Sequence, residues 1–169
     1  MAATVEVHEM GATQSGWQRD SKTVRFYATN ATATQAATNP LVIPGAASDW
    51  SYTKQLRFYM GATGPSGYVA SLKFYSDGTM WNNEASKVMV TYDKANRSTW
   101  GANVDTDISG ANIKGATSGA KASLCISASQ FTSTSTYFGG MLRLQMEVGN
   151  DASPGTLGDK TITFQYDEQ

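Results

Sequence analysis

YTKQLRFYM (residues 52–60), GATGPSG (61–67) and YVASLKFYS (68–76) follow one another in the middle of the chain and carry its most informative strand pattern. The two outer runs alternate with period two, which is the pattern of a strand that buries one face. We expect the buried faces to carry Tyr52, Leu56, Phe58, Met60, Tyr68, Ala70, Leu72 and Phe74, and the wet faces Thr53, Gln55, Arg57, Ser71 and Lys73. Because glycines and a proline fill the connector, the pattern predicts either a hairpin or two strands facing across a sandwich.

Further alternating runs occur on both sides of this stretch. They occupy residues 4–8, 23–27, 86–92, 120–127, 142–148 and 160–166. A short apolar run at 39–44, bounded by prolines, is compatible with an edge strand or a tucked extended segment. No segment shows a 3.6-residue period over three turns. The sequence therefore predicts an all-β fold, a single antiparallel β-sandwich of jelly-roll or immunoglobulin-like type with about eight to nine short strands.

The length of the chain limits the number of domains. At 169 residues it can form one domain with a core and is too short to suggest two. We expect one domain over residues 1–169, with an extended N-terminus and long loops at 28–39 and 93–119. Its core is expected to contain Val5, Val7, Phe58, Leu72, Phe74, Val88, Val90, Leu124, Leu142, Leu144, Ile162 and Phe164.

Charge and hydropathy exclude several kinds of partner. The net charge is −1, so the chain lacks the basic footprint of a protein that binds nucleic acid or an anionic membrane. No run approaches the ~20 apolar residues of a membrane span. The opening MAATVEVHEM has neither the basic n-region nor the apolar h-region of a signal peptide. We therefore expect folding in a reducing cytoplasm, where the sequons at Asn30 and Asn96 are chance matches, and no nucleic acid or membrane partner.

Residues for catalysis or metal binding are few. His8 and Cys125 are the single residues of their types, and neither lies in a motif that supplies a catalytic partner. One histidine and one cysteine do not make a zinc site. Oxygen ligands alternate from Asn103, but an EF-hand loop aligned there requires glycine at Ile108 and glutamate at Lys114. We expect no catalytic residue, no cofactor and no metal, and we leave open a looser calcium site in a surface loop.

The four tryptophans share one kind of setting. Trp17, Trp50, Trp81 and Trp100 all fall in turn-rich segments rather than in alternating runs. An indole in a loop either plugs one end of a sandwich or presents a flat apolar surface to a ligand or partner. We therefore take these four as the candidate interface residues.

Four parts of the chain carry a family resemblance. They are ATVEVHEM (3–10), NPLVIP (39–44), SYTKQLRFY (51–59) with LKFYSDG (72–78), and ASPGTLGDKTITFQYDE (152–168). In these strand-and-turn patterns the chain resembles small structural proteins of tailed-bacteriophage virions, the kind attached to the head or its appendages. The resemblance covers both ends and the middle of the chain.

The resemblance implies a non-enzymatic protein that binds the capsid and decorates or cements the shell. Its expected partners are the major capsid protein or other virion proteins and further copies of itself, as a homo-oligomer for which a trimer is possible. It would reside in the virion after assembly in the host bacterial cytoplasm. Two alternatives stay open: a tail, neck or fibre component, and a carbohydrate-binding β-sandwich module that uses the tryptophans. Coplanar exposed indoles favour the sugar binder, and buried indoles favour the virion protein.

Overall fold

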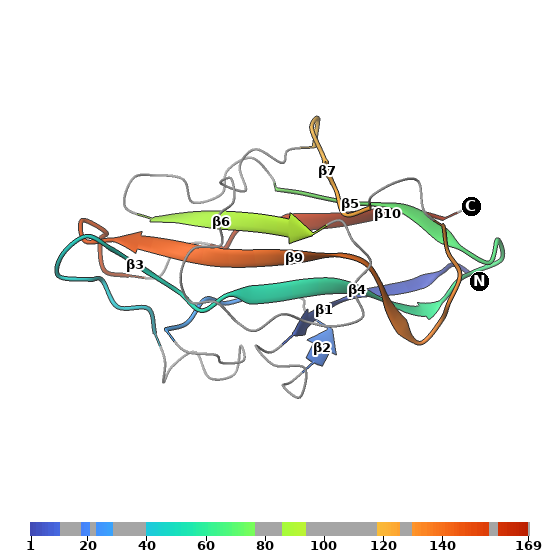
Figure 1. The fold of residues 1–169 in the computed structure, drawn as a ribbon, viewed down its shortest axis with the longest axis horizontal. Helices are drawn as coiled ribbons and strands as arrows, with labels where there is room; N and C mark the ends of the chain where they lie inside the picture. Colours follow the sequence, from blue (N-terminus) through green and yellow to red (C-terminus); the bar gives the residue numbers. More distant parts are fainter. Residues whose placement is uncertain are drawn as a thin grey trace.

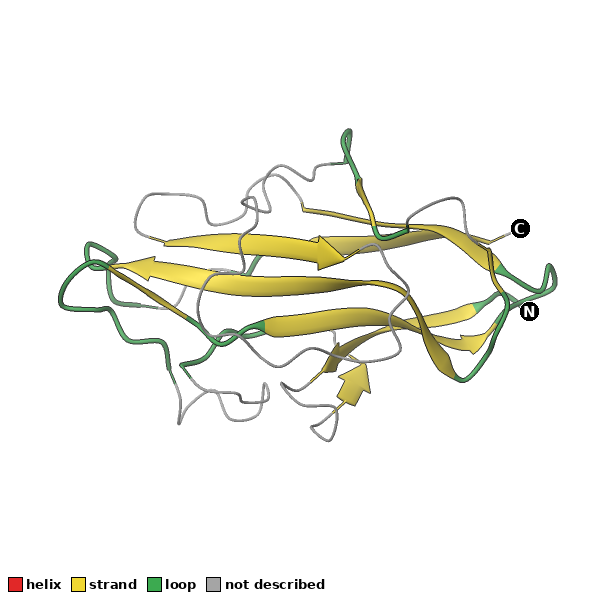
Figure 2. Ribbon diagram, in the orientation of Figure 1, coloured by secondary structure: helices red, strands yellow, loops and turns green. Residues whose placement is uncertain are grey.

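The computed structural model describes residues 1–10, 18–20, 23–28, 40–76, 86–93, 118–125, 130–155 and 159–168, with the backbone alone for 18–20 and 86–93. These residues form strands, turns and extended segments and no helix (Figures 1 and 2). Among them, accordingly, there is no helix with the length and apolar character that crossing a membrane requires. The strands form two sheets in which all pairings are antiparallel, as expected for the all-β class.

The larger sheet is built around its longest strand, β9. Its strands are β1 (Thr4–Met10), β2 (Gln18–Asp20), β3 (Ser48–Trp50), β4 (Lys54–Ala62), β6 (Ser86–Asp93) and β9 (Thr136–Gly149). β4 pairs with residues 136–144 of β9 and β3 with residues 147–149, while β6 pairs with 141–148. Because β6 shares partner residues on β9 with both β3 and β4, it must lie along the opposite edge of β9. β3 and β4 therefore lie in line along one edge, and β1 and β2 continue the sheet beyond β4.

Ser51 joins β3 to β4 without a gap in the hydrogen bonding. Its backbone N–H donates to the Met146 carbonyl at 2.9 Å, and its hydroxyl accepts from the Met146 N–H at 2.9 Å. The Gln145 side-chain amide donates to the Ser51 carbonyl at 2.7 Å. A buried backbone group without a partner would cost stability, and the serine hydroxyl removes that cost where the ladder breaks.

The smaller sheet is built around β5. It contains β5 (Val69–Ser76), β7 (Ala122–Ser123), β8 (Gln130–Phe131) and β10 (Ile162–Glu168). β10 pairs with β5 over its whole length. β7 and β8 pair with different parts of β5, at residues 73–74 and 69–70.

One hydrophobic core is shared by the two sheets. Its buried members are Leu56, Phe58, Met60, Val69, Leu72, Phe74, Leu124, Cys125, Phe138, Leu142, Leu144, Met146 and Val148. Aromatic rings make contacts from one sheet to the other: Phe58 of β4 meets Phe164 of β10 at 5.5 Å between centroids, and Phe131 of β8 meets Phe138 of β9 at 5.1 Å. In β4 and in the second part of β9 the core positions are alternate residues of the strand, as a sheet with one core face requires.

A bulge in β9 links the two sheets through hydrogen bonds. Arg57 pairs with Met141 and Phe58 with Phe138, so two extra residues of β9, 139 and 140, bulge between these pairs. The Gly140 N–H donates to the Leu124 carbonyl at 2.8 Å, and the Leu124 N–H donates to the Leu72 carbonyl at 2.8 Å. The residue before Gly140 is a glycine with φ +68, a conformation that L side chains rarely adopt.

Much of the expected core is confirmed. Phe58, Leu72, Phe74, Leu124, Leu142 and Leu144 are buried, and Val5, Val7, Ile162 and Phe164 are partly buried against them. The side chains of Val88 and Val90 lie outside the described residues, as do most of the two long loops expected at 28–39 and 93–119. Ten strands occur in the described part, so the expected number of eight to nine is not confirmed.

The alternating runs at 52–60 and 68–76 do not form a hairpin. β4 lies in the larger sheet and β5 in the smaller one, which is the other arrangement that the pattern allowed. The face assigned to the first half of β5 is also wrong, because Val69 is buried whereas Tyr68 and Ala70 are only partly buried. Ser71 has φ +56, and the pairing with β10 shifts there by one extra residue. A β-bulge of this kind changes the face on which the following residues lie.

The second face of β4 is not wet, contrary to expectation. Thr53, Gln55 and Arg57 are between 1% and 4% exposed. Each of the three interacts with other groups, so the face is packed against the protein rather than exposed to water. Alternation shows which side chains share a face, but it does not show whether that face meets water.

Two expected strands are absent or shorter. Residues 23–27 are not a strand, since the Tyr27 carbonyl accepts from the Tyr52 N–H at 2.9 Å but no ladder follows. The run expected at 120–127 is reduced to the two residues of β7, and 126–127 lie outside the description. Residues 40–44 form the tucked extended segment, because a proline at each end removes a backbone donor.

Candidate functional site

An apolar hollow lies at the end of the molecule that carries β3. Its walls are residues 23–27, 40–43 and 152–155, with Met146 and Val148 from the end of β9, and its volume is about 720 Å³. A second hollow of about 290 Å³ shares Leu41, Val42 and Val148 with the first. Volumes of several hundred Å³ are typical of sites that accept a small ligand or an anchoring side chain.

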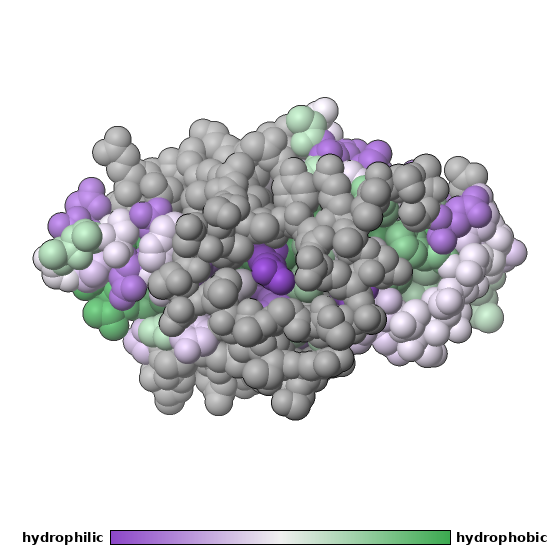
Figure 3. Space-filling view, viewed as in Figure 1, coloured by the Kyte–Doolittle hydropathy of each residue, from purple (hydrophilic) through white to green (hydrophobic). Residues whose placement is uncertain are grey.

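The segment 40–43 gives the hollow its apolar character. Leu41 and Ile43 pack against the core, so the residue between them turns outward. That residue, Val42, is 67% exposed. Hydrophobic surface is visible at this end of the molecule in Figure 3. An exposed apolar side chain beside a hollow is a common feature of surfaces that bind a partner.

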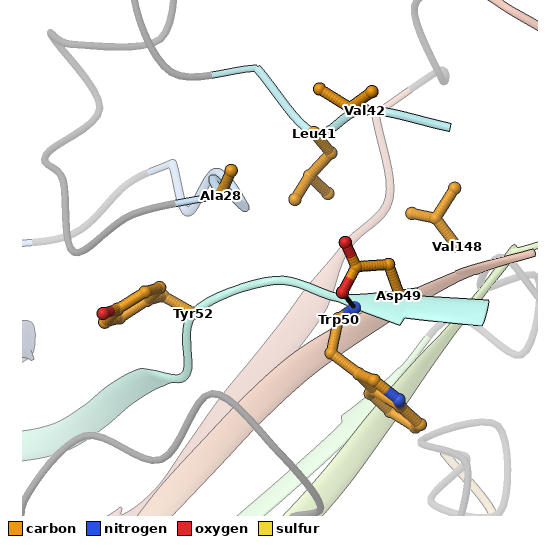
Figure 4. A pocket seen from close by; sticks show the side chains of 7 residues that line it. All are labelled: Ala28, Leu41, Val42, Asp49, Trp50, Tyr52 and Val148. Atoms are coloured by element: carbon orange, nitrogen blue, oxygen red, sulfur yellow. Dashed lines mark hydrogen bonds between the residues drawn. The ribbon is translucent and has the colours of Figure 1, made fainter. Parts of the chain in front are cut away.

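Three charged residues line the hollows: Arg25, Asp49 and Asp159. The Asp49 carboxylate accepts a hydrogen bond from the Trp50 N–H at 2.8 Å and is turned toward Leu41 (Figure 4). Two acids and one base leave this region with a formal charge of −1, so its binding capacity comes mainly from its apolar walls.

Of the four candidate tryptophans, the structure describes only Trp50. It is partly buried, and its indole points away from Leu41 and Val42 (Figure 4). Trp50 borders the smaller hollow but does not present its ring to these two residues. Trp17, Trp81 and Trp100 lie outside the described residues, so their use at an interface stays a prediction.

A polar and aromatic cluster lies on the other face of the larger sheet, away from the core. We call Glu6, His8, Tyr59 and Tyr137 the His8 cluster. Pairing places Glu6 beside Tyr59 and Tyr59 beside Tyr137, so three neighbouring strands contribute. His8 Nε2 is 2.7 Å from the Glu6 carboxylate and its Nδ1 is 2.9 Å from the Tyr137 hydroxyl. The imidazole also stacks on Tyr59, with 4.7 Å between ring centroids.

The hydroxyl of Tyr137 stays protonated over a wide pH range. Burial raises its pKa, Tyr59 and Glu6 raise it further, and Arg57 opposes them. A protonated phenol can donate to Nδ1 of a neutral His8, whose Nε2–H then donates to Glu6. The chain of hydrogen bonds ties β1 to β9 across β4. Neither of the two hollows includes a residue of the cluster, so the cluster holds strands together but faces no described cavity.

No sequence motif placed a partner beside His8, but the structure supplies two. Its side chain is only 14% exposed and both ring nitrogens have partners. The residue pattern identified β1 and β4 but not residues 136–141 as part of a strand, so the contribution of Tyr137 was missed. The signal available was the aromatic pair Tyr137 and Phe138, which only GGM (139–141) separates from LRLQMEV (142–148).

Cys125 is a buried thiol. Its Sγ lies 4.0 Å from the Leu72 carbonyl, and its backbone N–H donates to the Ser123 hydroxyl at 3.2 Å. Burial raises the pKa of the thiol, and the hydrogen bond to Leu72 only partly opposes this. A thiol with a raised pKa is a poor nucleophile at neutral pH, because the thiolate is the reactive form.

A buried ion pair was also missed by the sequence reasoning. Lys54 Nζ lies 3.1 Å from the Glu9 carboxylate, and these side chains are 2% and 0% exposed. The Lys54 ammonium also lies 4.8 Å from the centroid of the Tyr27 ring. Both charged residues occupy positions with the parity of core residues, Glu9 with Val7 and Lys54 with Leu56. That parity was the available signal for a pair in the interior.

The described side chains contain no group of three or more His, Cys, Asp and Glu residues that could hold a metal ion. The calcium-like sequence at Asn103 lies outside the described residues. Compared with models of protein families, with curated proteins and with solved structures, the chain shows no match.

Proposed function

We propose that this protein is a non-enzymatic structural protein of a bacteriophage virion, which binds the capsid and stabilises the shell. The observation that carries the binding role is the apolar hollow with Val42 exposed at its rim. Burying one aliphatic side chain of this size contributes about 1.5–3 kcal/mol. When a modest contact is repeated over a symmetric shell, the overall affinity exceeds that of a single contact.

The chemistry of the other clusters is compatible with a non-enzymatic role. The Cys125 thiol and the Tyr137 phenol both have raised pKa values, which keeps them protonated at neutral pH. The His8 imidazole is engaged at both nitrogens and lines neither hollow. These side chains therefore act as structural links between strands in our proposal.

We further infer that the two sheets form one β-sandwich of jelly-roll or immunoglobulin-like type. The shared core supports the sandwich, since side chains from both sheets interdigitate in it. The passage of the chain from β4 in one sheet to β5 in the other supports a connection of the kind found in those folds.

The hollow can be tested with one substitution and a matched control. Val42→Glu places a charge at the apolar rim, whereas Ser66→Glu places the same charge on an exposed turn. Each variant is incubated with DNA-filled heads that lack the protein, and co-sedimentation gives the bound fraction. We expect Val42→Glu to weaken binding about tenfold or more, which corresponds to the loss of one buried aliphatic contact. Equal binding by both variants would remove the hollow from the contact surface.

The same binding assay, repeated with isolated tails, distinguishes binding to the head from binding to the tail. If isolated tails bind the protein and heads do not, the tail, neck or fibre alternative replaces the capsid proposal. No described residue specifically favours the carbohydrate module, because the one described indole is partly buried and turned away from Leu41 and Val42.

A further inference from the structure

The outer edge of β10 has no strand partner among the described residues. β10 is the last strand of its sheet and pairs with β5 along its inner edge only. An edge strand presents a row of backbone N–H and C=O groups, which can pair with a strand of another molecule. The question is whether this edge is protected against such pairing.

β10 carries little of the usual protection. It is seven residues long, ITFQYDE, contains neither proline nor lysine, and has its two charged residues only at its C-terminal end. The bulge in its pairing with β5 places the extra residue on β5, so β10 itself stays regular. The outer strands β2, β3, β7 and β8 have only two or three residues, and short edges pair weakly. β6, with eight residues, is the other long edge, but its side chains are not described.

The sequence around β10 is complementary to itself. When two copies pair antiparallel, a core-facing residue must lie beside a core-facing residue for the two cores to stay on one side. Phe164 faces the core, because its ring contacts Phe58. A two-fold axis at Phe164 satisfies this condition and places Phe164 beside its own copy. The remaining cross-strand pairs are then Ile162 with Tyr166, Thr163 with Gln165, Thr161 with Asp167 and Lys160 with Glu168.

Each of these pairs is favourable. Apolar residues meet aromatic ones on the core face, polar residues meet polar ones on the outer face, and opposite charges meet at both ends. Moving the axis to Gln165 or Tyr166 places Glu168 beside Ile162 or Phe164, which pairs a charge with an apolar side chain. The register centred on Phe164 is therefore the best of these three.

We propose that β10 is a self-association edge, through which two copies of this chain pair antiparallel about a two-fold axis at Phe164. The smaller sheets of the two molecules then form one continuous sheet across the dimer. The contact is isologous, meaning that each copy contributes the same residues, and such a contact closes at two copies. This inference does not rest on capsid binding, and it is tested on the isolated protein.

The proposed dimer is tested by reversing the charge of Lys160 or Glu168, the pair at each end of the register. Lys160→Glu places two acids together at each end, and Glu168→Lys places two bases together. Asp151→Lys is the control, because Asp151 is exposed in the turn after β9 and lies outside the register. Sedimentation velocity over a concentration series gives the dimer dissociation constant of each variant, and thermal melting checks that each is folded.

We expect a dimer for the unmodified chain and for Asp151→Lys. Each single reversal should weaken it about tenfold, since two cross-strand pairs change from attraction to repulsion. An equimolar mixture of Lys160→Glu and Glu168→Lys should restore the dimer as a heterodimer, as should the double variant carrying both changes. A monomer at all concentrations, a trimer as the only oligomer, or a dimer equally tight in every variant would overturn the proposal. A dimer that is equally tight in every variant would make β6 the next edge to test.

Discussion

Gly139 is the residue on which the link between the two sheets depends most directly, and its replacement by alanine should destabilise the protein strongly. It lies in the bulge of β9 with φ +68, next to the residue whose N–H bonds to Leu124. A Cβ atom added at Gly139 would lie 2.2 Å from the Leu72 Cδ1 atom, far inside van der Waals contact. Alanine therefore introduces both backbone strain and a clash in the core.

The magnitude follows from two contributions. A non-glycine residue in the left-handed region costs about 1–2 kcal/mol. Overpacking a well-filled core costs about 1–3 kcal/mol, because Leu72 must leave its rotamer or the backbone must shift. We expect Gly139→Ala to lower the free energy of unfolding by about 2–5 kcal/mol, a large part of the stability of a domain of this size.

Urea unfolding followed by tryptophan fluorescence measures this change, with Gly45→Ala as the matched control. Gly45 has no atom within 4 Å of an added Cβ and does not have a positive φ. Its replacement should be neutral or should stabilise by about 0.4–1 kcal/mol through the unfolded chain. The midpoint should therefore fall for Gly139→Ala and stay or rise for Gly45→Ala.

A second variant separates the clash from the strain. Leu72→Ala removes the atom that an alanine at Gly139 would meet. If the clash contributes, the double variant should lose less stability than the sum of the two single losses, by about 1–3 kcal/mol. A change below about 0.5 kcal/mol for Gly139→Ala would contradict both the clash and the strain, because such a change is typical of surface positions without special features.

Three further predictions concern the buried polar groups. Lys54→Met should cost about 3–5 kcal/mol by chemical unfolding because it leaves the Glu9 carboxylate buried without the ammonium, and adding Glu9→Leu should recover most of that loss. Tyr137→Phe removes the hydroxyl that hydrogen-bonds to His8 and should cost about 1–3 kcal/mol. Since the folded pKa of this phenol is raised, its contribution to stability is complete below the ordinary tyrosine pKa and is lost as the pH rises through the folded value. The variant should therefore lose less stability in alkali than the unmodified chain. Cys125, buried and with a raised pKa, should react with iodoacetamide much more slowly in the folded protein than in urea, and equal rates in both would contradict its burial.

The sequence alone was sufficient for the class of the fold and for most of the core. Leu142, Leu144 and their neighbours alternate without interruption, and the structure places them in the longest strand. Periodicity works there because one face of the strand packs on the core over its whole length. The apolar positions of β4 are identified for the same reason.

The bulges could not be predicted in the same way. At Ser71 one extra residue moves Val69 into the core, and nothing in the letters YVASLKFYS marks that position. The pairing that creates a bulge involves residues far apart in the chain, in this case in β10. Local alternation therefore assigns the faces correctly only up to the first irregularity.

The candidate sites depended on contacts between distant strands. The His8 cluster requires β1, β4 and β9 to be adjacent, and the sequence contains no motif that states this order. The apolar hollow arises where the tucked residues 40–43 pass beside the end of β9. The prolines indicated only an edge strand or a tucked extended segment and left the choice open. Of the tryptophans chosen as candidates, Trp50 borders a hollow while its ring points away from Leu41 and Val42.

Whether the protein binds and stabilises the capsid is decided by its location in intact particles and by its effect on their stability. Particles assembled with and without this protein are compared by electron cryomicroscopy and by the temperature at which they release DNA. We predict additional density at symmetry-related positions over the whole head, and release at a lower temperature when the protein is absent. Density confined to the tail, together with equal release temperatures, would contradict the capsid-binding account.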